Sequence, residues 1–263
     1  MIRKILAIAH CYYHEETIYP SNFILYTLNR IVEIVVYICV WQAIFNQTGN
    51  AGGMTISQMV TYYILVASLR PFALWGVNEE MGRNIRSGQI NRELLNPISY
   101  FQYYFGKFIG QRFFAVLMSI ATFVLCILFW QMAWPANITH FILFLILILL
   151  GIPITFYFQM LIGLTAFYTN SIWGVNVLKK ALTSILSGII APITVFPQWF
   201  QSLSAWLPFQ ELIYTPIHVY LGEIPPEQIL GIIVKQLIWI FLLGILAHLL
   251  FKRASKKITV FGG

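Results

Sequence analysis

The chain has 263 residues, of which 59% are hydrophobic and 10% are charged, with a net charge of +7. A soluble domain carries roughly 25% charged residues, so the composition excludes a water-soluble fold of this length. The basic residues lie between apolar runs and near the two ends, with no basic stripe of exposed aromatic residues, which argues against a nucleic-acid partner.

Residues 1–20 precede the first long apolar run and mix charged residues with Ile, Leu and Tyr. This pattern predicts an amphipathic helix that lies along the cytoplasmic membrane interface before the chain turns upward at Pro20. His10, Cys11 and His14 lie within it, and the two histidines would share one helix face. With no fourth ligand in reach, we interpret them as interfacial packing residues and expect no metal site.

Six apolar segments are long enough to cross a bilayer, which takes about 20 residues of helix. They are residues 22–45, 57–75, 106–130, 138–168, 174–196 and 229–251. The fourth is longer than a bilayer requires, so it must tilt, bend or protrude, and Gly151 and Pro153 offer a place for a kink. We therefore expect an all-α membrane protein with six transmembrane helices in one transmembrane domain over residues 1–263.

The positions of the basic residues predict the orientation of these segments. Lys and Arg are absent from the connections over residues 45–57, 130–138 and 197–227, and they occur in the alternate connections and near both ends. Cytoplasmic connections carry the excess of Lys and Arg. The alternation therefore predicts that both termini are cytoplasmic.

The cytoplasmic connection over residues 79–97 is too long and too patterned for a simple turn. Ser87-Gly88 marks a turn, and residues 89–95 are long enough for a short helix on which Ile90 and Leu94 share a face, with Leu95 beside them. One interpretation is a solvated loop whose basic residues touch lipid headgroups. The other is a docking helix for a cytoplasmic partner.

The external connection over residues 192–227 is rich in aromatic residues and has no Lys or Arg. Pro197, Pro208 and Pro216 interrupt it too often for a span, and it is too apolar to lie free in water. Short re-entrant helices that dip into the outer leaflet fit both constraints, with their non-helical backbone covered by protein. An ordinary interfacial aromatic belt is the alternative.

Charged residues inside the spans are candidate functional residues, because burying a charge in hydrocarbon is costly. Arg30 and Glu33 are three residues apart in the first span and can pair along the helix. The pair would be structural or would line a transport path. Arg70, near the inner end of the second span, and Lys235, near the outer end of the last, are expected to extend toward the headgroups.

The sequence lacks the residues that catalysis would need. It contains no GxxxxGK[ST] loop, so we do not expect the chain to bind ATP, and ATP hydrolysis would belong to a separate subunit. The chain has no aspartate and no polar cluster around a nucleophile, which argues against an enzyme. We expect this chain to bind no cofactor.

Several motifs carry a resemblance to a known family. Ile85-Arg86-Ser87-Gly88 is followed by Leu94-Leu95-Asn96-Pro97, Phe196-Pro197-Gln198-Trp199 is followed by Leu207-Pro208-Phe209, and the basic tail ends in Phe261-Gly262-Gly263. Together with the N-terminal helix, these motifs resemble the type-2 ATP-binding-cassette (ABC) exporter permeases. The resemblance is greatest to the short bacterial subfamily that has six spans and no fused ATPase.

The resemblance implies a permease subunit that moves a hydrophobic or amphipathic cargo by alternating access. Its partners would be a cytoplasmic ATPase dimer, which binds ATP and Mg, and a second permease chain, identical or homologous. The location would be the cytoplasmic membrane of a bacterium. Two other functions stay open: a stand-alone channel or proton-coupled carrier that depends on Glu33, and a membrane enzyme or assembly factor.

The resemblance also assigns roles to residues. The cytoplasmic loop resembles a coupling helix that docks on the ATPase, which implicates Arg83, Ile85, Arg86, Ser87, Gly88, Ile90, Leu94 and Leu95. The external segment resembles a re-entrant hairpin that closes the outer end of the path, which implicates Phe196, Pro197, Trp199, Leu207, Pro208 and Phe209.

Overall fold

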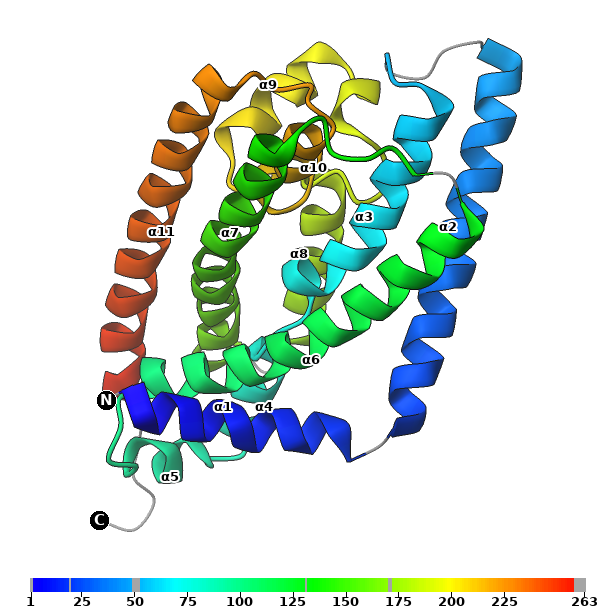
Figure 1. Cartoon of the computed structure of the whole chain (residues 1–263). Helices are drawn as coiled ribbons and strands as arrows, with labels where there is room; N and C mark the ends of the chain where they lie inside the picture. Colours follow the sequence, from blue (N-terminus) through cyan, green and yellow to red (C-terminus); the bar gives the residue numbers. More distant parts are fainter. Residues whose placement is uncertain (1, 19, 49–52, 131, 170–171, 258–263) are drawn as a thin grey trace.

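The computed structural model describes residues 2–18, 20–48, 53–130, 132–169 and 172–257. Within these ranges the chain is all helical and has no β-strand, as the composition predicts. Long helices run between the two ends of the molecule, where the short helices gather (Figure 1). The tail motif Phe261-Gly262-Gly263 lies outside the described residues.

Five helices of the described chain are long and apolar enough to cross a bilayer. They are α2 (Pro20–Thr48), α3 (Ile56–Leu74), α6 (Tyr100–Phe129), α7 (Ile138–Leu164) and α11 (Pro226–Ala254). Each coincides with a predicted span, and α7 continues as helix through Pro153. α6 begins at Tyr100, earlier than predicted, because the Ser99 hydroxyl accepts a hydrogen bond from the Gln102 backbone N–H and caps the helix there.

The predicted span over residues 174–196 is not a single long helix, so the prediction of six spanning helices is not confirmed. α8 (Trp173–Leu186) has 14 residues and extends about 21 Å, short of the roughly 30 Å of hydrocarbon. It ends because Gly188 takes the left-handed conformation, with φ of 84°. The Tyr62 hydroxyl of α3 donates to the Gly188 carbonyl at 2.7 Å and holds the turn in place.

α3 is the central helix of the molecule. Every residue from Met59 to Leu69 is buried, and α2, α6, α7, α8 and α10 all contact it. Its last turn, near Leu74, is therefore surrounded by protein. The carbonyl groups that end a helix need hydrogen-bond donors, and in this position neighbouring helices must supply them.

The segment predicted as external re-entrant helices forms a cap of short helices at one end (Figure 1). It contains η2 (Ile193–Val195), α9 (Gln198–Trp206), η3 (Gln210–Leu212) and α10 (Tyr214–Tyr220). α9 lies on the surface, with Trp199 and Trp206 exposed, whereas residues 215–220 of α10 are all buried. The non-helical backbone between these helices is thus covered by the rest of the protein.

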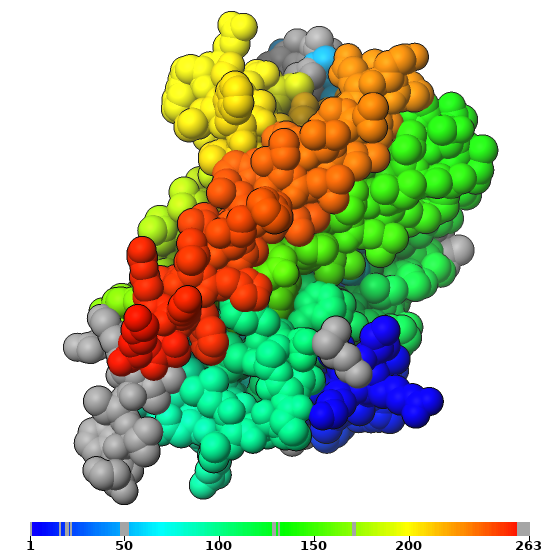
Figure 2. Space-filling model, turned by 90° about the vertical axis from the view of Figure 1, so that its left-hand side faces the viewer, coloured from blue at the N-terminus to red at the C-terminus, as the bar shows by residue number. Residues whose placement is uncertain are grey.

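The opposite end holds α1 (Ile2–Thr17), α4 (Asn78–Arg86), α5 (Ile90–Leu94) and the end of α11, which η4 (Ser255–Lys257) continues. α1 runs across this end and packs on α6 (Figure 1). Figure 2 shows α11 as a ridge along one side of the molecule, from the cap of short helices down to the end that carries α1. The other short helix, η1 (Thr165–Phe167), extends the end of α7.

Candidate functional site

The predicted coupling segment folds as a helical hairpin of α4 and α5. α4 carries Glu79 and Glu80 in its first turn and Arg83 and Arg86 in its last, an order that complements the helix dipole and favours helix here. Gly88, with φ of 75°, makes the turn into α5. The hairpin follows the central helix α3 almost directly in the chain, so it is tied to the middle of the fold.

The hairpin presents an exposed surface at the α1 end of the molecule, which we call the hairpin face. It consists of Arg83, Arg86, Ser87, Gly88, Leu94 and Leu95. Leu95 is 86% exposed, and Leu94 39%. Ile85 is half-buried, and Ile90 is only 3% exposed, inside the core cluster that includes Tyr100 and Tyr104. The prediction that Ile90 and Leu94 form one docking face is therefore wrong, because Ile90 anchors α5 from the inside.

A buried carboxylate holds α5 against α6. Glu93 is 7% exposed, and the Tyr104 hydroxyl lies 2.9 Å from each of its carboxylate oxygens. Asn84 of α4 donates to the same group at 2.7 Å. Burial raises the pKa of Glu93, and these two donors partly offset the rise because they stabilise its charged form. One side chain thus ties both arms of the hairpin to a long helix.

A buried lysine joins α1, α4 and α6. Lys107 is 1% exposed and pairs with Glu80 of α4. Its Nζ also lies 4.4 Å from the ring centre of Tyr12, 4.8 Å from that of Tyr103 and 5.4 Å from that of Tyr104. Aromatic faces attract a cation, so the three rings and Glu80 together hold the ammonium group in place. The cage connects the base of the hairpin to both helices around it.

The end of α3 is capped by side chains from two other long helices. Arg112 of α6 is 4% exposed and donates to the carbonyl groups of Pro71 and Trp75. Gln159 of α7 also donates to the Trp75 carbonyl, at 2.5 Å. A positive charge at the negative end of the α3 dipole is favourable. The caps therefore fix the point at which α3 passes into the hairpin.

A third cap comes from α8. Lys179 is 3% exposed and donates to the Leu74 carbonyl at 3.1 Å and to Asn78 Oδ1 at 3.2 Å. Asn78, the first residue of α4, in turn donates to Asn176 of α8. Sequence reasoning treated Lys107, Arg112 and Lys179 only as markers of cytoplasmic connections and missed these roles. The available signal was that Arg112 lies well inside an apolar helix, where a charge needs a partner.

The charged residues of the first two spans pair differently from the prediction. Glu33 of α2 pairs with Arg70 of α3, whereas Arg30 has no hydrogen-bond partner on its terminal nitrogens among the described residues. Arg70 is thus held by Glu33 and does not extend freely to the headgroups. Arg30, Glu33 and Arg70 line a hollow of about 310 Å³ that also includes Trp75 and Lys180.

Lys235 of α11 is likewise held inside the protein. It donates to Glu211 of η3 at 2.6 Å, and Glu211 is only 2% exposed. The next residue, Gln236, donates to the Glu211 carbonyl at 3.2 Å. The expected extension of Lys235 toward the headgroups is therefore wrong, because Lys235 fastens α11 to the cap of short helices.

The six residues predicted for the outer gate lie at the two ends of α9 and do not form one cluster. Phe196 packs against Phe200 of α9 in a tilted arrangement, with ring centres 4.6 Å apart. Phe209 meets Phe158 of α7 edge to face at 5.2 Å. Pro208 is buried, Leu207 is half-buried, and Pro197 and Trp199 are exposed. After α9, Phe209 contacts α7, whereas at the start of α9 Pro197 and Trp199 are exposed and Phe196 is half-buried.

Comparison with known protein families identifies the family of the chain. Residues 31–262 match the family model described as ABC-2 family transporter protein. The match covers most of the chain, including the hairpin, the residues that cap α3 and the cap of short helices. The chain belongs to this family. It is thus a multi-pass membrane protein and a permease component of an ABC transporter. No curated protein matches the chain closely enough to report.

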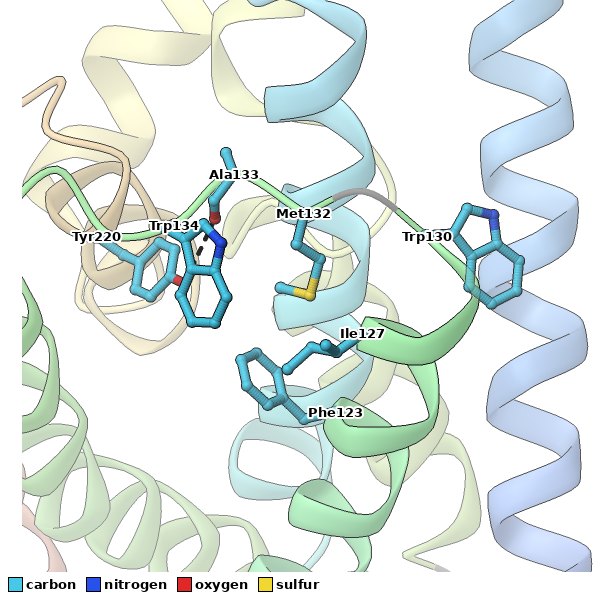
Figure 3. Close-up of a pocket in the computed structure, with 7 residues that line it drawn as sticks. All are labelled: Phe123, Ile127, Trp130, Met132, Ala133, Trp134 and Tyr220. Atoms are coloured by element: carbon cyan, nitrogen blue, oxygen red, sulfur yellow. Dashed lines mark hydrogen bonds between the residues drawn. The ribbon is translucent and has the colours of Figure 1, made fainter.

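The permease has a second hollow at the end that carries the cap of short helices, which sequence reasoning did not find (Figure 3). It measures about 280 Å³ and is lined by Phe123, Ile127, Trp130, Met132, Ala133, Trp134 and Tyr220. Tyr220 of α10 donates to the Ala133 carbonyl at 3.4 Å, which closes one side of the hollow. The lining has no charged residue, so it suits an apolar group.

The histidine pair of the permease lies on α1. His10 and His14 face each other with 3.1 Å between their Nε2 atoms, and Cys11 is exposed beside them. Within the described ranges no three His, Cys, Asp or Glu side chains come together as metal ligands would. The pair offers two nitrogens, fewer than a structural zinc site uses.

Proposed function

We propose that this permease forms the membrane path of an ABC exporter and moves a hydrophobic or amphipathic cargo by alternating access. A separate cytoplasmic ATPase dimer, which binds ATP and Mg, docks on the hairpin face and drives the movement. This chain itself binds no cofactor and carries out no catalysis. ABC-2 permeases generally work with such ATPases, and the family match supports the same arrangement here.

The observation that carries the proposal is the link between the hairpin face and the long helices. Leu95 and the arginines of the hairpin are exposed, while Glu93 and Lys107 fasten the same hairpin to α1 and α6. Arg112, Gln159 and Lys179 connect its beginning to α6, α7 and α8. A push on the hairpin is thus transmitted to four long or intermediate helices as a rigid movement.

We further propose that the chain is one domain that crosses the membrane six times, with both termini in the cytoplasm. α8 begins at the hairpin end and the chain reaches the outer cap before α11 begins (Figure 1), which supports a sixth crossing made of α8 and the residues after it. The hairpin end carries Arg3, Lys4, Arg83 and Lys252, whereas residues 192–227 have no Lys or Arg. Cytoplasmic connections carry this excess, and the membrane would be the cytoplasmic membrane of a bacterium.

The proposed path lies between this chain and a second permease, identical or homologous. α2 contacts its own chain mainly through α3 and α6, and its apolar residues Leu25, Leu28, Val32 and Val36 are exposed. Lipid or a second permease would cover this side. The cap of short helices would close the outer end as a gate. Its candidate gate residues are Pro197 and Trp199, which are exposed, Phe196 and Leu207, which are half-buried, Pro208, which is buried, and Phe209, which packs on α7.

Affinity purification of the tagged permease from its native membranes tests the proposal. The expected result is co-purification of a P-loop ATPase, identified by mass spectrometry, and its loss in the double variant Arg86→Glu with Leu95→Glu. The matched control, Ile2→Glu with Arg3→Glu on α1, places the same charges at the same end and should retain the ATPase. If no ATPase appears while the chain stays folded, the proposal fails and Glu33 should be tested in a proton-coupled carrier.

A further inference from the structure

Arg30 is a buried cation with no ion-pair partner of its own among the described residues, because Glu33, the carboxylate that attracts it, pairs with Arg70. Arg30 is 7% exposed, and neither of its terminal nitrogens has a hydrogen-bond partner among the described residues. Its guanidinium carbon lies 5.8 Å from the centre of the Trp75 ring, but an aromatic face supplies no charged acceptor. A buried charge is costly unless it is paired and hydrogen-bonded. Arg30 therefore lacks an anionic hydrogen-bond acceptor.

The other charges around Arg30 are already paired. The hollow beside it shares Tyr26, Leu74, Trp75 and Lys180 with a neighbouring hollow of about 290 Å³, and we call the two together the inner groove. Glu33 pairs with Arg70, and Glu79 pairs with Lys180 at 2.9 Å. The charges within each of these two pairs cancel, so the positive charge of Arg30 is the one that remains. The inner groove therefore carries a net charge of about +1.

The inner groove opens at the surface of the protein, beside the buried guanidinium group of Arg30. Tyr26 and Asn29 of α2 are exposed at its edge, as is Lys180 of α8, so the lining is not enclosed. Water that entered would hydrogen-bond to Arg30 but would leave its charge unbalanced. An anion would supply both the acceptors and the negative charge, and Arg binds a phosphate or a carboxylate through two parallel hydrogen bonds.

The surface next to the inner groove is apolar. Leu25, Leu28 and Val32 lie on the neighbouring stripe of α2 and are 63%, 53% and 62% exposed. One helix thus presents a polar stripe, with Tyr26, Arg30 and Glu33, beside an apolar stripe. A molecule with a charged head and an apolar tail matches both stripes at once, whereas a small soluble anion uses only the first.

We propose that the inner groove binds the anionic group, a phosphate or a carboxylate, of an amphipathic molecule whose apolar part lies along α2. Arg30 is the residue that binds the anion, with Arg70 and Lys180 nearby as secondary cations. If the proposed transport function holds, this anionic amphipathic molecule is the class of cargo that the permease carries. Only that step of the inference rests on the proposed function. The site itself needs no ATPase.

Lipid binding to the purified full chain, measured by native mass spectrometry in detergent, tests the site. The probes are phosphatidylglycerol and phosphatidylcholine with identical acyl chains, and inorganic phosphate as the soluble anion. Arg30→Gln should weaken phosphatidylglycerol binding by about tenfold or more, the effect of losing a charged hydrogen bond. Lys252→Gln, an exposed lysine at the end of α11, is the control and should bind as the unmodified chain does.

A second variant distinguishes a loss of lipid binding at the site from a loss caused by misfolding. Glu33→Gln frees Arg70 from its partner and adds a second unpaired cation, so it should tighten phosphatidylglycerol binding several-fold. A misfolded chain would not gain affinity.

The proposal is overturned by any of three results. Arg30→Gln retains full binding of the anionic lipid, Lys252→Gln loses as much as Arg30→Gln, or inorganic phosphate competes as well as the lipid does. The test is independent of the ATPase experiment. Co-purification of an ATPase with unchanged lipid binding in Arg30→Gln would remove the site and leave the exporter, and the reverse pattern would leave the site and remove the exporter.

Discussion

Glu33 of α2 pairs with Arg70 of α3 and not with Arg30, three residues before it on its own helix. The pair joins α2, which has a long exposed apolar side, to the central helix of the fold. Because both side chains are partly buried, with 25% and 38% exposed, their attraction is stronger than that of a surface pair and weaker than that of a fully buried one.

The first prediction follows from this pair. Glu33→Gln and Arg70→Gln should each destabilise the permease, and the double variant should lose less than the sum, with a coupling free energy of about 0.5–2 kcal/mol. Thermal unfolding in detergent measures all three variants. A double variant whose loss equals the sum would show that the two side chains do not interact. The charge exchange Glu33→Arg with Arg70→Glu should recover part of the stability.

The second prediction compares two adjacent lysines. Lys179→Met should cost about 2–4 kcal/mol, because it leaves the Leu74 carbonyl and Asn78 without their donor inside the protein. Lys180→Met removes a half-exposed partner of Glu79 and should cost less than about 1 kcal/mol. Unfolding of the two variants under identical detergent conditions measures the difference. Equal losses would contradict the role of Lys179 as a cap of α3.

The third prediction concerns the contact between α1 and α6. A Cβ at Gly110 would lie 2.5 Å from the Ala9 carbonyl oxygen, so Gly110→Ala must displace α1 and should cost about 1–3 kcal/mol. Gly174→Ala on α8 is the control, because nothing lies within 4 Å of its added Cβ. It should be neutral or stabilising, since Ala favours helix over Gly. Thermal unfolding of the two variants measures the difference. If Gly110→Ala is as stable as the unmodified chain, the close packing of α1 on α6 at Gly110 is contradicted.

The fourth prediction is a dependence on pH. The pKa of Glu93 is raised by burial, so the folded protein holds this proton at a pH at which the unfolded chain has released it, and stability falls as pH rises through that range. Tyr104→Phe removes a donor to the charged form and raises the pKa of Glu93 further. Its loss of stability, about 1–3 kcal/mol at neutral pH, should shrink toward pH values near the ordinary pKa of about 4.3.

The control for this pH dependence is Tyr13→Phe, whose ring packs against Phe113. It should show the pH profile of the unmodified chain. Unfolding temperatures between about pH 4 and pH 8 measure both variants, in the range where a glutamate titrates. A deficit in Tyr104→Phe that does not change with pH would mean that its hydroxyl acts on packing and not on the charge of Glu93.

Sequence periodicity and composition were sufficient for the five long helices and for the turn at Ser87-Gly88, because apolar runs and turn residues are local signals. They were insufficient for α8. Its end at Leu186 depends on the Gly188 turn, which Tyr62 holds from a helix more than 100 residues away. An apolar run gives no sign of such a contact, so the predicted span continued to Phe196.

The place of the hairpin in the chain was predictable, but its internal contacts were not. The hairpin face lies where the motifs around Arg86 and Leu95 place it. The inward direction of Ile90, the choice of Arg70 as partner of Glu33, and the burial of Lys107 each depend on helices distant in sequence. A charge near the end of an apolar run looks the same whether it meets solvent or the end of another helix.

The capped end of α3 has a consequence for how the chain tolerates changes in length. The carbonyl groups of Pro71, Leu74 and Trp75 each meet a donor from a different place on α6, α7 or α8. An insertion or deletion of one residue in α3 would turn everything beyond it by about 100° and shift it by about 1.5 Å. The three donor side chains would then no longer reach their carbonyl groups. The number of residues in α3 is therefore constrained as strongly as the identity of the side chains that cap it.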